Sequence, residues 1–306
     1  MLNVAFEAAH IKRLEKPVLP VDVVLDTDTY NEIDDQFALA YMMKSSDKLN
    51  VKALYAAPFL NSKSTSPKDG MEKSHEEILR ILSLMGREDF YPSVYKGSET
   101  FLPSETEPVN SVAAAHLAQL AMGYSTEKPL YVVAIGAITN VASALLIKPE
   151  IKDRIVVVWL GGHAHHWHDT REFNMFQDVA AARIIFGCGV PLVQLPCMGV
   201  VSEFRLGGPE LEHWLRGKNP LCDYLVDVTT RDAIADGGLS TWTRVIWDVT
   251  AVGWLTGDFT LDRLVHTPVP EYSNRYSFPQ SGRLMRYVYH INRDALALDL
   301  FNVLSS

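Results

Sequence analysis

The chain has 306 residues, of which 47% are hydrophobic and 21% charged, and a formal net charge of −9. This composition is typical of a folded protein with a large core and argues against long disordered segments. The negative charge, without a basic stripe, excludes proteins that bind a nucleic-acid backbone, because such binding needs clustered Lys and Arg.

Short apolar runs alternate with helical patterns along the first two thirds of the chain. Continuous apolarity without polar alternation is typical of strands covered on both faces, as in a parallel sheet. The predicted strands are 21–26, 51–57, 130–135, 155–160 and 191–195. The predicted helices are 34–44, 71–86, 111–123, 138–147 and 178–189. We therefore expect one α/β domain over 1–306, with a mostly parallel open sheet flanked by helices.

The pattern changes after residue 200. Helices are predicted at 207–217 and 246–257, and the segment 266–293 alternates like a hairpin or a pair of edge strands. Loops that follow strands carry binding residues. We expect the loops 61–70, 163–171 and 223–247 to select the ligand.

The cysteines and the N-terminal segment bear on location. Cys188, Cys197 and Cys222 are an odd number without CxxC spacing, which indicates neither a disulfide framework nor a thiolate zinc site. No segment has the uninterrupted apolar character of a signal peptide or a membrane span. The interpretation is a cytoplasmic protein with reduced thiols and no membrane partner.

Four aspartates, Asp26, Asp28, Asp34 and Asp35, lie within ten positions at the end of the first predicted strand. Open α/β sheets bind ligands at this edge. Helix capping by Asp34 or Asp35 accounts for only one or two of them. Carboxylates so close together repel one another unless a cation neutralises them, and Ca²⁺ or Mg²⁺ prefers oxygen ligands. The cluster predicts a divalent metal site.

Further ligands must come from distant segments, because no EF-hand spacing is present. Thr139 and Asn140 follow the predicted strand 130–135, and Asp248 is a lone acid in an apolar helical pattern. Burying an unpaired carboxylate is costly. We therefore favour Asp248 as a ligand over its alternative role as a helix N-cap.

The segment "LDTDTYNEIDDQFAL" resembles the D-x-D-P-G-x-D-D-x-x-A opening of the inosine-uridine-preferring nucleoside hydrolase family. The resemblance covers about residues 21–255 and continues, in the family's order, with "VYKGSETFL", "AIGAITNVASAL", "VVVWLGG", "EFNMFQDVAAARIIF" and "IWDVTAVGWL". It implies a Rossmann-like nucleoside hydrolase fold, and hydrolysis of ribonucleosides to free base and ribose by a water activated on Ca²⁺. It also implies a homodimer or homotetramer.

The resemblance assigns roles residue by residue. It implies that Asp28 is both a metal ligand and the general base, and that Asp35, the backbone carbonyl of Thr139 and Asp248 complete the protein ligands of Ca²⁺. Asp26 would support this group. The residues implied to hydrogen-bond the ribose hydroxyls are Asp34, Asn61, Glu172 and Asn174.

The sequence departs from the family motif in the turn after Asp28. Asp35 lies seven positions after Asp28, where the motif has five, and "TYNEI" replaces the Pro-Gly turn. The longer turn can bring Asn31 or Glu32 into the pocket.

A second departure lies next to Asp248. Trp247 replaces the His that acts on the leaving group in pyrimidine-accepting members, which resembles the purine-specific branch. We expect Trp247 to stack on a purine base. The alternative is a Trp that only packs in the core.

A third departure is the histidine run His163, His165, His166 and His168. His166 falls where the family has an Asn that contacts ribose, so a histidine facing ribose or base and able to donate a proton is expected there. The sequence does not indicate which of the four faces the pocket. The alternative is a transition-metal site, for which Asp169 is the only nearby acid.

Two other functions fit parts of the sequence. "DTDTY" is similar to the D-x-D-x-T/V opening of haloacid-dehalogenase-like phosphatases, but Tyr30 and Asn31 depart from that pattern. A nucleoside- or pentose-binding protein without turnover would keep the carboxylates and release no base. The full set of implied ligands favours an enzyme over both.

Overall fold

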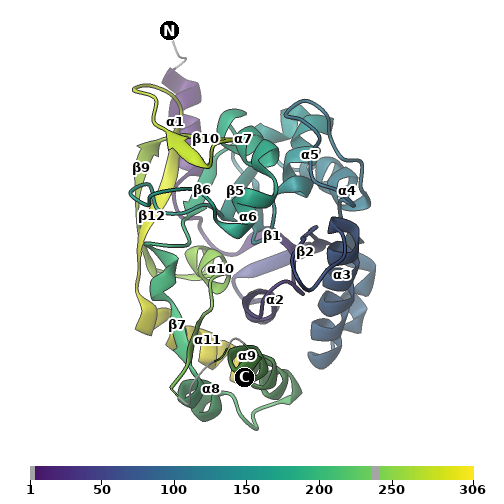
Figure 1. Ribbon diagram of the computed structural model, residues 1–306. Helices are drawn as coiled ribbons and strands as arrows, with labels where there is room; N and C mark the ends of the chain where they lie inside the picture. Colours follow the sequence, from purple (N-terminus) through teal and green to yellow (C-terminus); the bar gives the residue numbers. More distant parts are fainter. Residues whose placement is uncertain (1–3, 236, 238–240) are drawn as a thin grey trace.

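The computed structural model describes residues 4–235, 237 and 241–306 (Figure 1). Its strands are β1 (Val21–Thr27), β2 (Leu49–Ala56), β3 (Val94–Lys96), β4 (Leu130–Ala134), β5 (Ile155–Leu160), β6 (Leu192–Leu195), β7 (Arg205–Gly207), β8 (Thr243–Val245), β9 (Thr260–His266), β10 (Val269–Glu271), β11 (Arg275–Ser277) and β12 (Leu284–Ile291). Its α-helices are α1 (Val4–Arg13), α2 (Asp34–Lys44), α3 (Pro67–Leu84), α4 (Val112–Ala121), α5 (Thr139–Ile147), α6 (Phe173–Gln177), α7 (Val179–Gly187), α8 (Gly208–Trp214), α9 (Pro220–Ala235), α10 (Val249–Thr256) and α11 (Arg293–Ser305). Short 3₁₀ helices span Glu88–Ser93, Pro149–Asp153 and Val201–Glu203.

The centre of the fold is an eight-stranded sheet in the order β3-β2-β1-β4-β5-β6-β12-β9. Every neighbouring pair is parallel except β12 and β9, which are antiparallel at one edge. The predicted α/β fold with a mostly parallel open sheet is confirmed. The strand order reverses direction between β1 and β4, and the carboxyl ends at such a reversal form a ligand-binding crevice.

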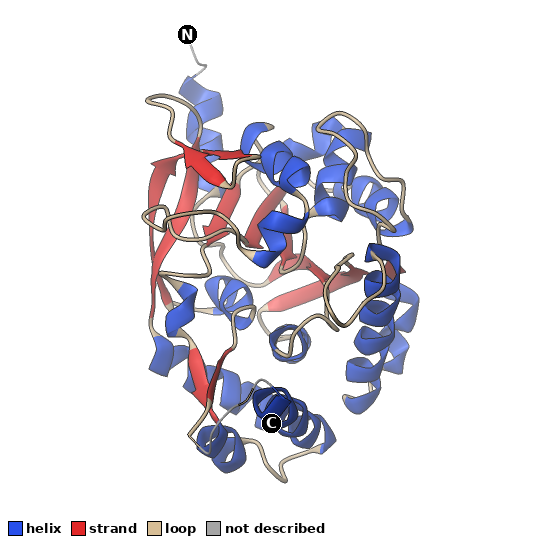
Figure 2. Cartoon of the chain, in the orientation of Figure 1, coloured by secondary structure: helices blue, strands red, loops and turns tan. Residues whose placement is uncertain are grey.

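Two layers of helices cover the sheet, as the cartoon in Figure 2 shows. Alternate residues of β5 enter two separate cores: Val156 and Val158 pack in one, Val157 and Trp159 in the other. The first core includes residues of α2, α10 and α11, and the second includes residues of α4, α5 and α7. Burial on both faces explains why the strand sequences are apolar without alternation.

Helix starts in this fold follow ordinary capping chemistry. Ser66 accepts a hydrogen bond from the Asp69 N–H at the start of α3, with Pro67 at the first helical position. Asp178 caps α7 by accepting from the Ala181 N–H. These caps fix where the helices leave the sheet and therefore which side chains face its carboxyl edge.

Some predictions about the last third of the chain were wrong. The segment 223–247 is not mainly a loop, because α9 runs to Ala235 and β8 follows; residues 236 and 238–240 lie outside the described residues. Helices α1 and α11 were not predicted. In α11, Leu296, Leu300 and Leu304 form a buried stripe at four-residue spacing. The hairpin β10–β11 and the edge pair β9–β12 confirm the alternating pattern of 266–293.

The thiols and the composition of the helices are the features that bear on the predicted location, which stays a prediction. All three cysteines are free thiols. None of the described helices combines the length and the apolar character that a membrane crossing requires.

Candidate active site

A cavity of about 170 Å³ lies at the carboxyl edge of the sheet, near the reversal of strand order. Loops and helix starts that are far apart in the sequence form its walls. The lining residues are Asp28, Asn31, Glu32, Asp34, Asp35, Ile135, Leu160, His163, Arg171, Glu172, Phe173, Asn174, Cys197, Met198, Trp247 and Asp248. Four of the predicted catalytic or metal-binding residues, Asp28, Asp35, Trp247 and Asp248, are therefore brought together here.

Three buried aspartates form the acidic centre of the cavity. Asp34, Asp35 and Asp248 each offer a carboxylate oxygen, and these oxygens all lie within 4.8 Å of one another. The Asp248 N–H donates to Oδ2 of Asp34 at 3.3 Å, and the Thr27 hydroxyl donates to Oδ1 of Asp35 at 2.5 Å. Burial is the main cause that raises the pKa of Asp35 to about 7. The pKa values of Asp34 and Asp248 are also raised by burial first, with nearby carboxylates adding to it.

Asp28 lies beside this group with both carboxylate oxygens buried, and neither oxygen has a hydrogen-bond partner among the residues that the structure describes. Burial raises its pKa, and the negative charges of Asp35 and Asp34 raise it further. Gly136 packs closely against Asp28, since a Cβ at this position would lie 3.0 Å from Oδ1 of Asp28 and would require the carboxylate to shift. A buried carboxylate without donors, next to three others, has the all-oxygen character that a hard divalent cation requires. The donor set therefore fits a bound Ca²⁺ or Mg²⁺.

Helix capping does not account for these aspartates. The N-cap residue of α2 is Ile33, and neither Asp34 nor Asp35 precedes the helix. Asp248 occupies the N-cap position of α10, as its alternative role predicted, but its side chain makes no capping hydrogen bond. The carboxylates are therefore free to face the cavity.

A second polar network supports the strand ends behind the cavity. Oδ1 of Asp26 accepts from the Asn140 side chain at 2.8 Å, and burial raises the pKa of Asp26 to about 7. Asn140 also accepts from the Ser98 N–H, so its amide belongs to this network. The Thr139 hydroxyl donates to Asp178, which leaves the Thr139 backbone carbonyl as the group implied to bind the ion. That assignment stays a prediction.

Glu172 and Asn174 line the cavity, but most of their polar atoms already have backbone partners. Glu172 caps α6 and accepts from the N–H groups of Gly162, Asn174 and Met175. The Asn174 amide donates to the carbonyls of Ile135 and Leu160. Both side chains are therefore held rigidly, with only their remaining acceptor positions open to a ligand.

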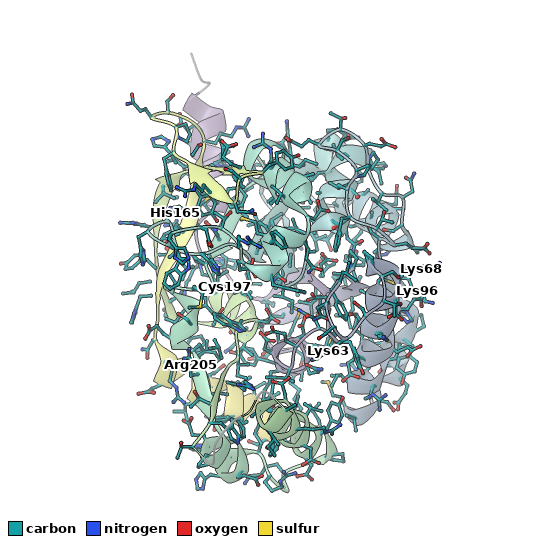
Figure 3. All side chains as sticks on the ribbon, in the orientation of Figure 1. Lys63, Lys68, Lys96, His165, Cys197 and Arg205 are labelled. Carbon is teal, nitrogen blue, oxygen red and sulfur yellow. The ribbon has the colours of Figure 1, made fainter. Side chains whose placement is uncertain are left out.

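A second cavity of about 520 Å³, which we call the annex, shares Asn31, Glu32 and Trp247 with the first. Asn61 lies in the annex and donates to the Asn31 side chain at 2.6 Å instead of lining the first cavity. Lys63 and Arg205 also line the annex, and Figure 3 labels both in the lower half of the view. Trp247 therefore stands at the junction of the two cavities.

The histidine run is resolved by the fold of its loop. His163 lines the cavity, whereas His166 is exposed and lies against Gly199, so the expectation that His166 faces the ligand is corrected to His163. The reason is that the Ala164 N–H donates to the Met198 carbonyl and the Met198 N–H donates to His163, which turns His163 inward.

The remaining two histidines point elsewhere. His165 packs against Tyr287, with ring centres 4.1 Å apart, and His168 pairs with Asp169. Among the described residues, the histidines join no group of metal-ligating side chains, so the transition-metal alternative finds no support there.

Some lining residues were not anticipated. Arg171 is adjacent to the "EFN" motif, and Cys197 follows the last predicted parallel strand; Figure 3 labels Cys197 near the middle of the molecule. Position after a strand at the carboxyl edge is the signal that can identify Cys197 and Met198. Nothing in the sequence alone distinguishes Arg171 from other loop arginines.

Comparison with known proteins agrees with this geometry. The sequence profile described as inosine-uridine preferring nucleoside hydrolase matches residues 23–273. A pyrimidine-specific ribonucleoside hydrolase, RihA, of Klebsiella pneumoniae (strain 342) is 27% identical over 218 residues, which are 64% of this chain and 66% of that protein. The match thus spans about two thirds of that relative.

Solved structures show the same fold. A plant nucleoside hydrolase aligns with a TM-score of 0.75 and 20% identity over 94% of this chain and 99% of that one. A purine-preferring ribonucleoside hydrolase from Gardnerella vaginalis aligns with a TM-score of 0.72 and 19% identity over 93% of this chain and 98% of that one. The profile match assigns the "DTD" opening to this family and not to the haloacid-dehalogenase-like phosphatases. The chain belongs to the inosine-uridine preferring nucleoside hydrolase family, whose members hydrolyse N-glycosidic bonds.

Proposed function

We propose that this protein hydrolyses purine ribonucleosides to free base and ribose in a Ca²⁺-dependent reaction with Asp28 as the general base. The observation that carries the proposal is the burial of the Asp28 carboxylate at the cavity without a hydrogen-bond donor from the described residues. Its two buried oxygens accept no hydrogen bond from the described part of the chain, and Asp28 lines the cavity that also holds Asp34, Asp35 and Asp248. Such a carboxylate is available to bind a cation and to accept a proton.

The proposed ion site consists of Asp28, Asp35, Asp248 and the Thr139 carbonyl, and the structure adds Asp34 to the residues within reach. Bound there, Ca²⁺ would lower the pKa of a water molecule and orient the ribose hydroxyls. Asp34 was assigned to ribose by the family resemblance. Its place among the three clustered oxygens supports a contact with the ion as well.

In the proposed reaction, Asp28 removes a proton from the attacking water. The water oxygen forms a bond to C1′ of the ribose, and the bond from C1′ to the base nitrogen breaks with its electron pair leaving on the base. The base then takes up a proton from solvent, and Asp28 releases its proton to solvent before the next turnover. The ribose passes through an oxocarbenium-like state, whose positive charge is stabilised by the buried carboxylates around it. Carboxylates so placed favour the transition state over the neutral substrate.

Trp247 carries the proposed purine preference. Its half-buried side chain lines both the cavity and the annex, so a base attached to a ribose in the cavity can stack on it. Asn61, in the annex, would then contact the substrate at this junction. The relative RihA is named pyrimidine-specific, so a comparison of purine and pyrimidine nucleosides is the direct test of this preference.

The test is incubation with adenosine, inosine, guanosine, uridine and cytidine, with measurement of free base and ribose. We expect release with Ca²⁺, loss on chelation, and recovery when Ca²⁺ is restored. Asp28→Asn should lower kcat by about 10²–10⁴-fold, the usual contribution of a general base. Asp258→Asn, which changes an exposed carboxylate that lines neither cavity, is the matched control.

A binding protein without turnover is the second candidate, because the turn after Asp28 is altered and His166 does not reach the cavity. It would bind nucleosides and release no base with any member of the panel. The predicted homodimer or homotetramer and the predicted cytoplasmic location stay predictions; sedimentation of the purified protein tests the first.

A further inference from the structure

One wall of the active-site cavity carries donor groups that the proposed reaction does not use. Arg171 and His163, from the loop after β5, both line this wall. Arg171 is an exposed lining residue, and its guanidinium lies 5.1 Å from the centre of the ring of Phe176, which does not line the cavity. Within the described part of the chain, no carboxylate forms an ion pair with Arg171. A guanidinium in this state can bind an anionic group of a ligand.

His163 presents an N–H group on the same wall. The Met198 N–H donates to Nδ1 of His163 at 3.3 Å, so Nδ1 carries no proton. The proton of the neutral ring must then be on Nε2. Burial lowers the pKa of His163, which keeps the ring neutral at pH 7. His163 therefore acts as a hydrogen-bond donor through Nε2.

The acids near this wall already have partners. Glu172 accepts three backbone N–H groups, at distances of 2.8–2.9 Å. Asp169 accepts the Arg171 N–H at 3.1 Å and pairs with His168 at 3.3 Å. The Cys197 thiol has a raised pKa and stays uncharged. Arg171 and His163 are thus the groups on this wall whose donors remain open to a ligand.

The shape of ribose decides which substituent reaches them. This step rests on the proposed function, in which the 2- and 3-hydroxyls lie at the aspartates and the base lies at Trp247. In a β-riboside the base on C1 and C5 on C4 leave the same face of the ring from the two carbons that flank the ring oxygen, so a group on C5 lies beyond the C4 end of the ribose and the base lies beyond the C1 end. The annex, on the Trp247 side, is lined by neither Arg171 nor His163. The geometry points to Arg171 and His163 as a binding site for a phosphate on C5, and we propose that the substrates are 5-phosphorylated ribosyl compounds.

The experiment compares inosine with inosine 5′-monophosphate, and with the 5′-diphosphate to separate a monoester from a pyrophosphate. We expect kcat/KM to favour a phosphorylated substrate by about ten-fold or more, the effect of one or two charge-assisted hydrogen bonds. Arg171→Met and His163→Ala should each reduce this ratio, and Arg171→Lys should retain part of it. Arg87→Met, which removes an arginine stacked 5.8 Å from Phe90 outside the cavity, should leave the ratio unchanged.

A binding measurement separates this inference from the proposed function. Ribose 5-phosphate and ribose are titrated calorimetrically into the Ca²⁺-loaded protein, and the phosphate should improve affinity about ten-fold in a manner that depends on Arg171. Such binding without any base release would contradict the proposed hydrolysis and keep the inference. Hydrolysis of inosine with neither cleavage nor binding of the phosphorylated compounds would overturn the inference alone. Loss of the preference in Arg205→Met but not in Arg171→Met would also overturn it, since the phosphate would then lie in the annex.

Discussion

Replacing Asp248 by Asn should affect stability in opposite directions with and without a metal ion. The carboxylate oxygens of Asp34, Asp35 and Asp248 lie within 4.8 Å of one another. Two full negative charges at that distance repel by about 3 kcal/mol at an effective dielectric constant of about 20. An amide of the same shape removes this repulsion and leaves the Asp248 N–H bond to Asp34 in place. Because shared protons already relieve part of the repulsion, we expect a gain of about 1–3 kcal/mol in the metal-free protein.

The reverse order is expected when Ca²⁺ is present. Wild-type protein should be stabilised by about 4.1 kcal/mol at a Ca²⁺ concentration of about 1,000 times its Kd, which exceeds the gain of the metal-free variant, and the variant should be stabilised by much less at that concentration, because it has lost a ligand. Urea unfolding, followed by the fluorescence of the six tryptophans, measures both states in chelator and in Ca²⁺. Asp258→Asn should change neither result by more than about 0.5 kcal/mol. The reasoning is refuted if the Asn variant is less stable than wild type in chelator at an unchanged m-value, or if no divalent cation stabilises the wild type.

Three further predictions test the surroundings of the site. Thr27→Val removes the hydroxyl that donates to Asp35 and should weaken Ca²⁺ binding about ten-fold by calorimetry; unchanged affinity would show that this bond does not position Asp35. Asp178→Asn alters the acceptor for Leu102, Ala181 and Thr139 and should lower the free energy of unfolding by about 1–3 kcal/mol in urea. Burial lowers the pKa of His165 to about 4, so its ring stays neutral in the folded state while the unfolded chain takes up a proton below about pH 6.5. The contribution of His165 to stability should therefore fall by about 3 kcal/mol as the pH drops from 6.5 to 4, opposite in sign to that of the buried Asp26 and Asp35, so the difference between wild type and His165→Gln across this range measures it.

The sequence predicted the parallel part of the sheet because burial on both faces leaves a direct signal. The run 155–160 coincides with β5, and the helix prediction 34–44 coincides with α2. The signal fails where elements have one exposed face and mixed composition. Helix α9 combines buried Leu221, Leu225 and Val226 with polar and β-branched residues. Its apolar stripe is therefore too weak for the sequence pattern to distinguish this helix from a loop.

The acidic part of the candidate site was predictable from the sequence, because buried carboxylates require a cation or a proton. Clustered aspartates require a cation or protons whatever the fold, and Asp248 was recognisable as an acid in an apolar context. The orientation of the histidine loop was not predictable. It depends on two hydrogen bonds between residues 163–164 and Met198, which lies over thirty positions later in the sequence. A loop has no regular repeat of inward and outward side chains, so the sequence alone does not indicate which histidine faces the cavity.

The longer turn between Asp28 and Asp35 explains how the site can keep its carboxylates and still differ from the family motif. The Asn31 N–H donates to the Asp28 carbonyl at 2.7 Å, which closes the turn directly after Asp28. The Asn31 side chain then accepts from Asn61 at 2.6 Å, so the turn is tied to the loop after β2. The inserted residues therefore displace the wall and leave Asp35 in the cluster. Asn31 and Glu32 line both the cavity and the annex, so the difference from the family motif lies where the base of the substrate would be placed. Substitutions of Asn31 or Glu32 should therefore change the selectivity for the base more than they change the affinity for the metal ion.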